Sequence, residues 1–281
     1  MQVIDFDTHF SDMLADWVEK NRSKYRNADA LEEASEEVYF SFMEKPAKWL
    51  GGLSPVAYFE QFESSEELIE LMKRYFVEDV PLPDMLAERL CELKDEKALL
   101  ALCLDREAPC AARMTGIEIL RELDSRLPMV DFIRWQVERQ EEEDILDNAL
   151  ESLRQMGEAV KKPCLIAFSA ADDEGKEALL DVLCDYPGEE EVFQFALNRF
   201  RTCRDKRALY AGYLAKLDDD RALEHLLDVA ESDDVCYTDF VEIRSAIERL
   251  GSDAPVRDWS NDPTYQAFKR VQRTQLKKRK Q

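Results

Sequence analysis

Apolar residues recur along most of this chain in pairs three positions apart, and the pairs return at a nearly constant interval. The second members of successive pairs lie 30, 33, 30, 31 and 33 residues apart. Residues three apart share one face of an α-helix, so each pair predicts a helix with an apolar stripe. An interval of about 31 residues predicts helices that stack as repeats. The six pairs are Leu90 and Leu93, Leu120 and Leu123, Leu153 and Met156, Leu183 and Tyr186, Leu214 and Leu217, and Ile247 and Leu250.

A short polar turn follows each pair and leads into a further helix. The turns hold acids or glycine, as at Asp95-Glu96 and Gly251-Ser252, and an aspartate there can cap the next helix. The next helices include those expected at residues 129–139, 192–201 and 222–230. Helices this short bury their stripes by stacking on neighbours. We therefore expect an all-α fold, with an α-solenoid of about six helical pairs over residues 81–256.

The two ends of the chain do not follow the interval. Residues 1–80 are expected to form a distinct helical N-terminal segment. In this segment Gly51-Gly52 permits a sharp turn, and Ser54 caps a helix that begins at Pro55. A further helix is expected at residues 65–77, before a boundary at Pro81. Residues 257–281 are expected to form a basic C-terminal helix and tail.

Two segments carry a resemblance to a known repeat family. Residues 149–157 (ALESLRQMG) and 246–251 (AIERLG) resemble the second helix of a HEAT-like repeat. The short period is similar to the form first described in phycobilisome lyases. The resemblance covers about residues 83–256 and implies a right-handed, armadillo-like solenoid whose second helices line a concave face that binds partners. Met156, Tyr186 and three turns without glycine depart from the pattern, which leaves the repeat boundaries open.

The net charge changes which partners are plausible. The chain carries −23 at pH 7, and residues 264–281 hold seven basic residues and no acid. Subtracting +7 from −23 leaves −30 on residues 1–263. A body this negative repels phosphate backbones and anionic membranes, so we expect neither as a partner of the body, and repulsion between copies favours a monomer. HEAT-like DNA glycosylases need a positive groove, which this charge argues against.

The compartment is inferred from what the sequence lacks. No apolar run approaches 18 residues, and the N-terminus has no basic start followed by an apolar stretch. The seven cysteines are odd in number and scattered. We expect reduced thiols and a cytoplasmic protein.

Candidate chemistry is confined to the N-terminus. Asp5-Phe6-Asp7-Thr8 resembles the first motif of haloacid-dehalogenase-like phosphatases, which must end a strand of a parallel sheet. Here it precedes a predicted helix, so we expect helix-capping acids and no phosphatase activity. Asp5, Asp7 and His9 could chelate a metal, but residues two apart suit a strand and a fourth ligand is missing. We therefore expect no catalytic, metal or cofactor site.

A second N-terminal motif has two interpretations. Residues 40–55 (FSFMEKPAKWLGGLSP) resemble, over 16 residues, the helical toxin-binding domain of some bacterial antitoxins, although Trp49 follows the proline here. The favoured interpretation is that Trp49 packs under the Gly51-Gly52 turn.

Acids on the second helices give the candidate partner-binding surface. Acid runs at 141–144 and 172–174 are expected to be solvated turns and N-caps instead. The favoured interpretation of the basic tail is a capping helix with a disordered basic end, and the alternatives are docking on the chain's own acidic surface and contact with another anion. The acids of the expected concave face are Asp147, Glu151, Glu177 and Asp181, and the tail residues are Lys269, Arg270, Arg273, Lys277, Lys278, Arg279 and Lys280.

These observations favour non-catalytic binding of a protein or peptide, and a basic partner is one option that the acids leave open. The first alternative is an enzyme or enzyme-associated HEAT-like protein. The second is nucleic-acid contact through the basic tail alone.

Overall fold

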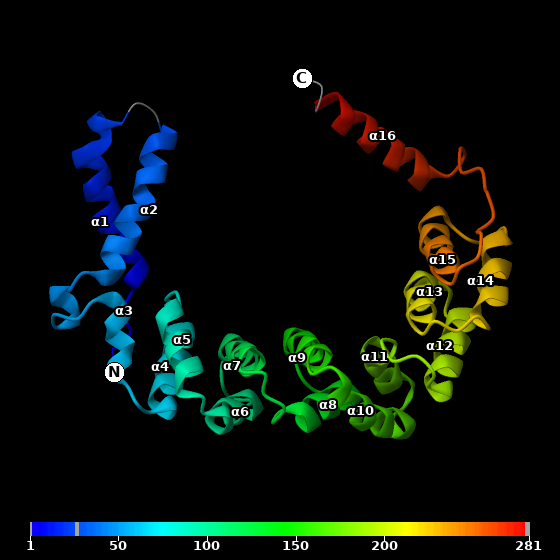
Figure 1. The fold of residues 1–281 in the computed structure, drawn as a ribbon, viewed down its shortest axis with the longest axis horizontal. Helices are drawn as coiled ribbons and strands as arrows, with labels where there is room; N and C mark the ends of the chain where they lie inside the picture. The colour runs from blue at the N-terminus through cyan, green and yellow to red at the C-terminus, as the bar shows by residue number, and fades with distance from the viewer. Residues whose placement is uncertain (1, 26–27, 279–281) are drawn as a thin grey trace. The chain divides into compact units, whose positions relative to one another are not determined.

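The computed structural model describes residues 2–25 and 28–278, and every element in them is helical, which confirms the all-α expectation (Figure 1). The chain divides into two compact units: unit 1 (residues 1–135 and 140–157) and unit 2 (residues 136–139 and 158–281). Among the described helices, none is long and apolar enough to span a bilayer. The boundaries expected near residues 80 and 256 stay predictions.

Unit 1 begins with helices that pack around aromatic side chains. Phe6, 5 % exposed, lies against the rings of Trp49, Tyr58 and Phe59. Ser54 caps α3 by accepting the backbone N–H of Ala57, as the sequence predicts. The helices are α1 (Phe6–Asn21), α2 (Ala28–Glu44), α3 (Pro55–Tyr58) and α4 (Ser65–Val77).

The rest of unit 1 alternates short helices. Helix α5 packs on α7, α7 packs on α9, and α6 packs on both α4 and α7. The expected caps form, since Asp95 accepts the N–H of Ala98 at the start of α6. The helices are α5 (Asp84–Leu93), α6 (Glu96–Leu104), α7 (Cys110–Glu122), α8 (Met129–Glu138, whose last residues belong to unit 2) and α9 (Glu143–Gln155).

Unit 2 has the same alternation. Helix α13 packs on both α12 and α15, and α14 packs on α15. Asp172 caps α11 by accepting the N–H of Gly175. The helices are α10 (Glu158–Ala170), α11 (Asp173–Leu183), α12 (Glu190–Thr202), α13 (Arg207–Lys216), α14 (Ala222–Glu231), α15 (Tyr237–Arg249) and α16 (Pro263–Lys278).

The repeating apolar pairs lie where the interval predicts, near the C-terminal ends of the odd-numbered helices α5 to α15. The first member of every pair is at most 1 % exposed: Leu90, Leu120, Leu153, Leu183, Leu214 and Ile247. The second members differ. Leu217 and Leu250 are buried, whereas Leu93 and Leu123 are half-buried, so the expectation that these two would be fully buried is wrong. All four residues stand at or just past the end of a helix, so position in the helix alone does not set their burial.

A left-handed backbone ends several of the odd-numbered helices, with or without glycine. Gly157 and Gly251 have φ of +59° and +81°. Lys94, Asp124 and Asp218 take the same role with φ of +54°, +52° and +52°. The turns that lack glycine therefore keep the same C-terminal geometry, at a steric cost of roughly 1–2 kcal/mol each for a residue with a Cβ.

Lys94→Gly is expected to raise the free energy of unfolding by about 0.5–1 kcal/mol, because glycine adopts this φ without steric cost. Urea unfolding followed by circular dichroism measures the change. The control is Ala101→Gly in the middle of α6, which should lower stability by about 1 kcal/mol. A loss of stability in Lys94→Gly would show that the lysine side chain contributes more than its backbone costs.

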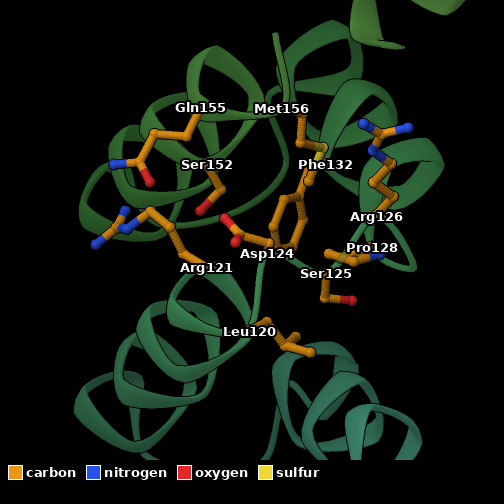
Figure 2. A pocket seen from close by; sticks show the side chains of 10 residues that line it. All are labelled: Leu120, Arg121, Asp124, Ser125, Arg126, Pro128, Phe132, Ser152, Gln155 and Met156. Carbon is orange, nitrogen blue, oxygen red and sulfur yellow. The ribbon is translucent and has the colours of Figure 1, made fainter.

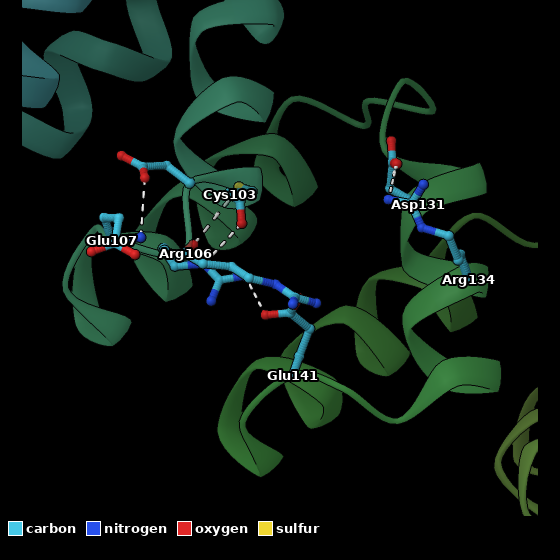
Figure 3. A network of polar contacts seen from close by, with 8 residues as sticks. Cys103, Arg106, Glu107, Asp131, Arg134 and Glu141 are labelled. Atoms are coloured by element: carbon cyan, nitrogen blue, oxygen red, sulfur yellow. Dashed lines mark hydrogen bonds and ion pairs between the residues drawn. The ribbon is translucent and has the colours of Figure 1, made fainter.

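A buried ion pair joins the helices in the middle of unit 1. The side chains of Arg113 and Glu141 are each 3 % exposed, and Nη2 of Arg113 lies 2.6 Å from Oε2 of Glu141. Arg106 contacts the other carboxylate oxygen, also at 2.6 Å, and Figure 3 shows Glu141 beside it. Nε of Arg113 donates to the carbonyl of Cys103 at 2.9 Å. The expectation that the acid run 141–144 is solvated is therefore wrong for Glu141, since the two arginines draw it into the core.

Candidate functional site

The most regular surface feature of unit 1 is a set of acids on α5, α7 and α9. Each helix carries two acids four residues apart, and residues at that spacing lie on one helix face. On all three helices one acid stands two residues before the repeat leucine, at positions 88, 118 and 151. We call the six residues the acidic row: Glu88 and Glu92 on α5, Glu118 and Glu122 on α7, and Asp147 and Glu151 on α9.

Side-chain contacts join the row from helix to helix. Asn148 of α9 donates to Oε1 of Glu118 at 3.3 Å, and its own Oδ1 accepts from Arg121 of α7 at 2.9 Å. On the other side, burial and then the charge of Glu122 raise the pKa of the Cys91 thiol of α5. Since α5 packs on α7 and α7 packs on α9, the acids of the row lie on neighbouring helices.

Most of the row carries unneutralised charge. Glu92 pairs with Arg89 at 2.9 Å, and Glu151 pairs with Arg154 at 3.2 Å. Among the described residues, the other four acids of the row form no ion pair with Lys or Arg. They are exposed, so each would contribute only about 0–1 kcal/mol to a contact, but several acting together attract a cationic partner.

The four acids predicted for the concave face fall into two pairs with different surroundings. Asp147 and Glu151 belong to the row in unit 1, whereas Glu177 and Asp181 lie on α11 in unit 2. Oε2 of Glu177 is 2.8 Å from Nη2 of Arg199, and its other oxygen contacts Lys206. Burial opposes ionisation of Glu177, but hydrogen bonds from Lys206, Tyr210 and Arg199 outweigh it and lower its pKa to about 2.

Asp181 is likewise engaged, since Oδ1 accepts from the Tyr213 hydroxyl at 3.0 Å. Both α11 acids thus have partners within unit 2, and their predicted partner-binding role stays a prediction. The row acids of α5 and α7 were missed from the sequence. Their signal was their position relative to Leu90 and Leu120, which matches that of Glu151 relative to Leu153.

The basic tail residues lie on α16 and beyond it. Nζ of Lys269 sits 4.5 Å from the ring centre of Tyr265, and Arg270 follows on the same helix. Arg273, Lys277 and Lys278 belong to the part of α16 whose side chains are not described, and Arg279 and Lys280 lie outside the described residues. Self-docking of the tail stays a prediction.

A cavity of about 260 Å³ opens where α7 and α9 end. Figure 2 shows the Phe132 ring at its centre, with Asp124 beside Ser152 and the side chains of Arg121 and Arg126 at the two sides. Ser125 donates to Glu96 at 2.5 Å and Ser152 donates to the carbonyl of Asn148 at 3.1 Å. The acceptor of the Ser152 hydroxyl is a backbone carbonyl, which cannot act as a base, so this serine is not arranged as an activated nucleophile.

The N-terminal motifs have structural roles. Asp5 caps α1, where its carboxylate accepts from the N–H and the hydroxyl of Thr8 at 2.8 Å and 2.6 Å. The hydrogen bond from the Thr8 hydroxyl is the largest of the effects that lower the pKa of Asp5. The His9 ring stacks on Trp49 with 3.9 Å between ring centres. In residues 2–25 and 28–278, no three His, Cys, Asp or Glu side chains gather to hold a metal ion.

Comparisons with known proteins identify no related protein. No protein-family model matches the chain, and neither the curated proteins nor the solved structures contain a significant match.

Proposed function

We propose that this protein is a non-catalytic HEAT-like α-solenoid that binds a basic protein or peptide through the acidic row. The observation that carries the proposal is the row itself, in which acids recur at equivalent positions of three successive odd-numbered helices. Such repetition offers an extended partner several carboxylates at regular spacing, which a single acid cannot do.

The register of polar contacts supports the repeat part of the proposal. In unit 1, Lys73 contacts Asp105, 32 residues away, and Arg106 contacts Glu141, 35 residues away. In unit 2, Arg221 contacts Glu190, 31 residues away. Two of these separations fall within the 30–33 residue interval and the third is two residues longer, as expected when each repeat contacts a similar part of the next.

The charge of the row supports a basic partner over other classes. Apolar or aromatic side chains do not dominate this face, whereas four of its six acids are without an ion pair among the described residues. A chain of −23 also steers cations towards itself over distances near the Debye length, roughly 10 Å at 0.1 M salt.

The triple variant Glu88→Lys, Glu118→Lys and Asp147→Lys tests the proposal. A fluorescein-labelled lysine-rich peptide is titrated with the protein, and anisotropy gives Kd at low salt. We expect Kd to rise at least about tenfold, which corresponds to about 1.4 kcal/mol lost over three exposed contacts. The affinity of the unaltered chain should fall steeply as salt rises.

The matched control reverses the charge of three exposed acids of unit 1 that lie outside the row: Glu33→Lys, Glu60→Lys and Glu107→Lys. It changes the net charge by the same amount, so it isolates position from total charge. We expect less than about a threefold rise in Kd. Equal weakening in both variants would mean that only net charge matters and would remove the row as the site.

A further inference from the structure

Helix α16 has an apolar side that the described residues of unit 2 leave more than half exposed. Its first turn packs on α15, where the Tyr265 ring lies 4.9 Å from that of Tyr237. Farther along, Phe268 is 52 % exposed and Val271 is 56 % exposed. A helix of 16 residues held at one end is marginally stable in water without a packing partner. The exposed side chains therefore indicate that α16 has a partner.

A groove of about 500 Å³ lies beside the root of this helix. It is formed by α15 and residues 255–265, and its apolar lining includes Phe240, Val241, Val256 and Trp259. Val241 is 41 % exposed on the surface of α15, and Val256 is fully exposed. Glu248 and Arg244 pair at 2.7 Å along the same helix, so the rim is polar. An apolar groove with a polar rim suits one face of an amphipathic helix.

We propose that α16 of a second copy of this chain docks Phe268 and Val271 in the groove, and that the exchange is reciprocal, which gives a weak dimer. In a two-fold dimer each copy gives one surface and receives the other, so both surfaces must be present on one chain. Here they are the apolar side of α16 and the groove on α15. The dimer uses unit 2 alone and is independent of the acidic row. It replaces the expectation of a monomer, which rested on net charge.

The geometry favours a second copy over the helix's own groove. Tyr265 already lines the groove and packs on Tyr237, which fixes the start of α16. Phe268 and Val271 then lie about 4.5 Å and 9 Å farther along the helix axis, at 1.5 Å per residue. Folding back would break the Tyr265 contact, whereas a second chain needs no such change. The basic residues Lys269 and Arg270 of one copy would approach the acids of the other, and this attraction offsets part of the repulsion between two chains of net charge −23.

Sedimentation velocity of the full chain over a wide concentration range tests the proposal. We expect a concentration-dependent dimer that persists at about 0.5 M salt, where charge–charge attraction is strongly screened. Phe268→Asp and Val241→Asp should each weaken dimerisation at least about tenfold. Both positions are exposed in the single chain, so circular dichroism should show unchanged folding. The control is Val130→Asp, a residue that is 71 % exposed on α8 and should leave dimerisation unchanged.

Three outcomes would overturn the proposal. A monomer at every concentration would do so, including one in which α16 folds back on its own groove. Dimerisation that fades by about 0.5 M salt and ignores Val241→Asp would indicate docking of the basic tail by charge alone. Equal weakening by Val130→Asp would place the contact elsewhere.

Discussion

Glu141→Ala should lower the free energy of unfolding by about 3–5 kcal/mol, the largest single-residue effect that we expect in this protein. The substitution leaves the Arg113 guanidinium buried, with its Glu141 partner gone, at a side-chain exposure of 3 %. Arg106 loses its partner as well, but its side chain is 55 % exposed and regains water. The cost therefore comes chiefly from Arg113. Urea unfolding monitored by circular dichroism measures it.

A double substitution tests whether the cost comes from the buried, unpaired charge of Arg113. Arg113→Met together with Glu141→Leu removes both charges and should recover much of the lost stability, since a well-packed apolar pair can replace a buried ion pair. Glu107→Ala, an exposed acid near α6, serves as the control and should change stability by less than about 0.5 kcal/mol. If Glu141→Ala cost no more than this control, the pair would have no structural role.

The same pair should make stability depend on acid pH. Burial acts to raise the pKa of Glu141, but hydrogen bonds from Arg113 and Arg106 outweigh it, so the pKa lies below its ordinary value of 4.5. A lowered folded-state pKa gives stability that is fully present above the unfolded-state pKa and is lost as pH falls through the folded value. The difference in unfolding free energy between Glu141→Gln and the unaltered chain should therefore shrink below pH 4.5.

Leu153→Ala should cost about 2–5 kcal/mol of unfolding free energy, the range for truncating a fully buried leucine. Leu153 is 0 % exposed on α9 and represents the buried first member of all six apolar pairs. Part of the cost is lost apolar burial and part is the cavity left when neighbouring helices do not collapse. Chemical denaturation gives the value.

Leu127→Ala is the matched control, because Leu127 is 44 % exposed in the turn before α8. It should change stability by less than about 0.5 kcal/mol. A cost for Leu153→Ala close to that of Leu127→Ala would contradict the assignment of the repeating leucines to the core.

The local features of this chain were readable from the sequence because they depend on neighbours a few residues away. A helix N-cap needs only one side chain and an N–H two or three positions on, so Ser54, Asp95 and Asp172 could be placed in advance. The period of the apolar pairs likewise reports helix faces, and the first members are all buried. The burial of two second members, Leu93 and Leu123, was overestimated. Burial at a helix end depends on which residues follow the helix and pack over it.

The turns after the odd-numbered helices show that a left-handed helix end does not always require glycine. Glycine is the usual residue for a left-handed helix end, so its absence at Lys94, Asp124 and Asp218 suggested irregular repeats. The structure keeps the same φ at all three.

What the sequence determined by itself is the all-α fold, the helix limits to within about two residues at α8, α12 and α14, and the burial of the first member of each apolar pair. Only the tertiary structure decided which partners surround each individual charged side chain. Glu141 was expected in a solvated acid run and Glu177 on a partner-binding face, yet arginines 28 and 22 residues away bind them. The acids of α5 and α7 read as scattered, yet neighbouring helices line them up with those of α9. A carboxylate's role depends on which distant cations and acids folding brings near it. The spacing of residues along the sequence does not contain this information.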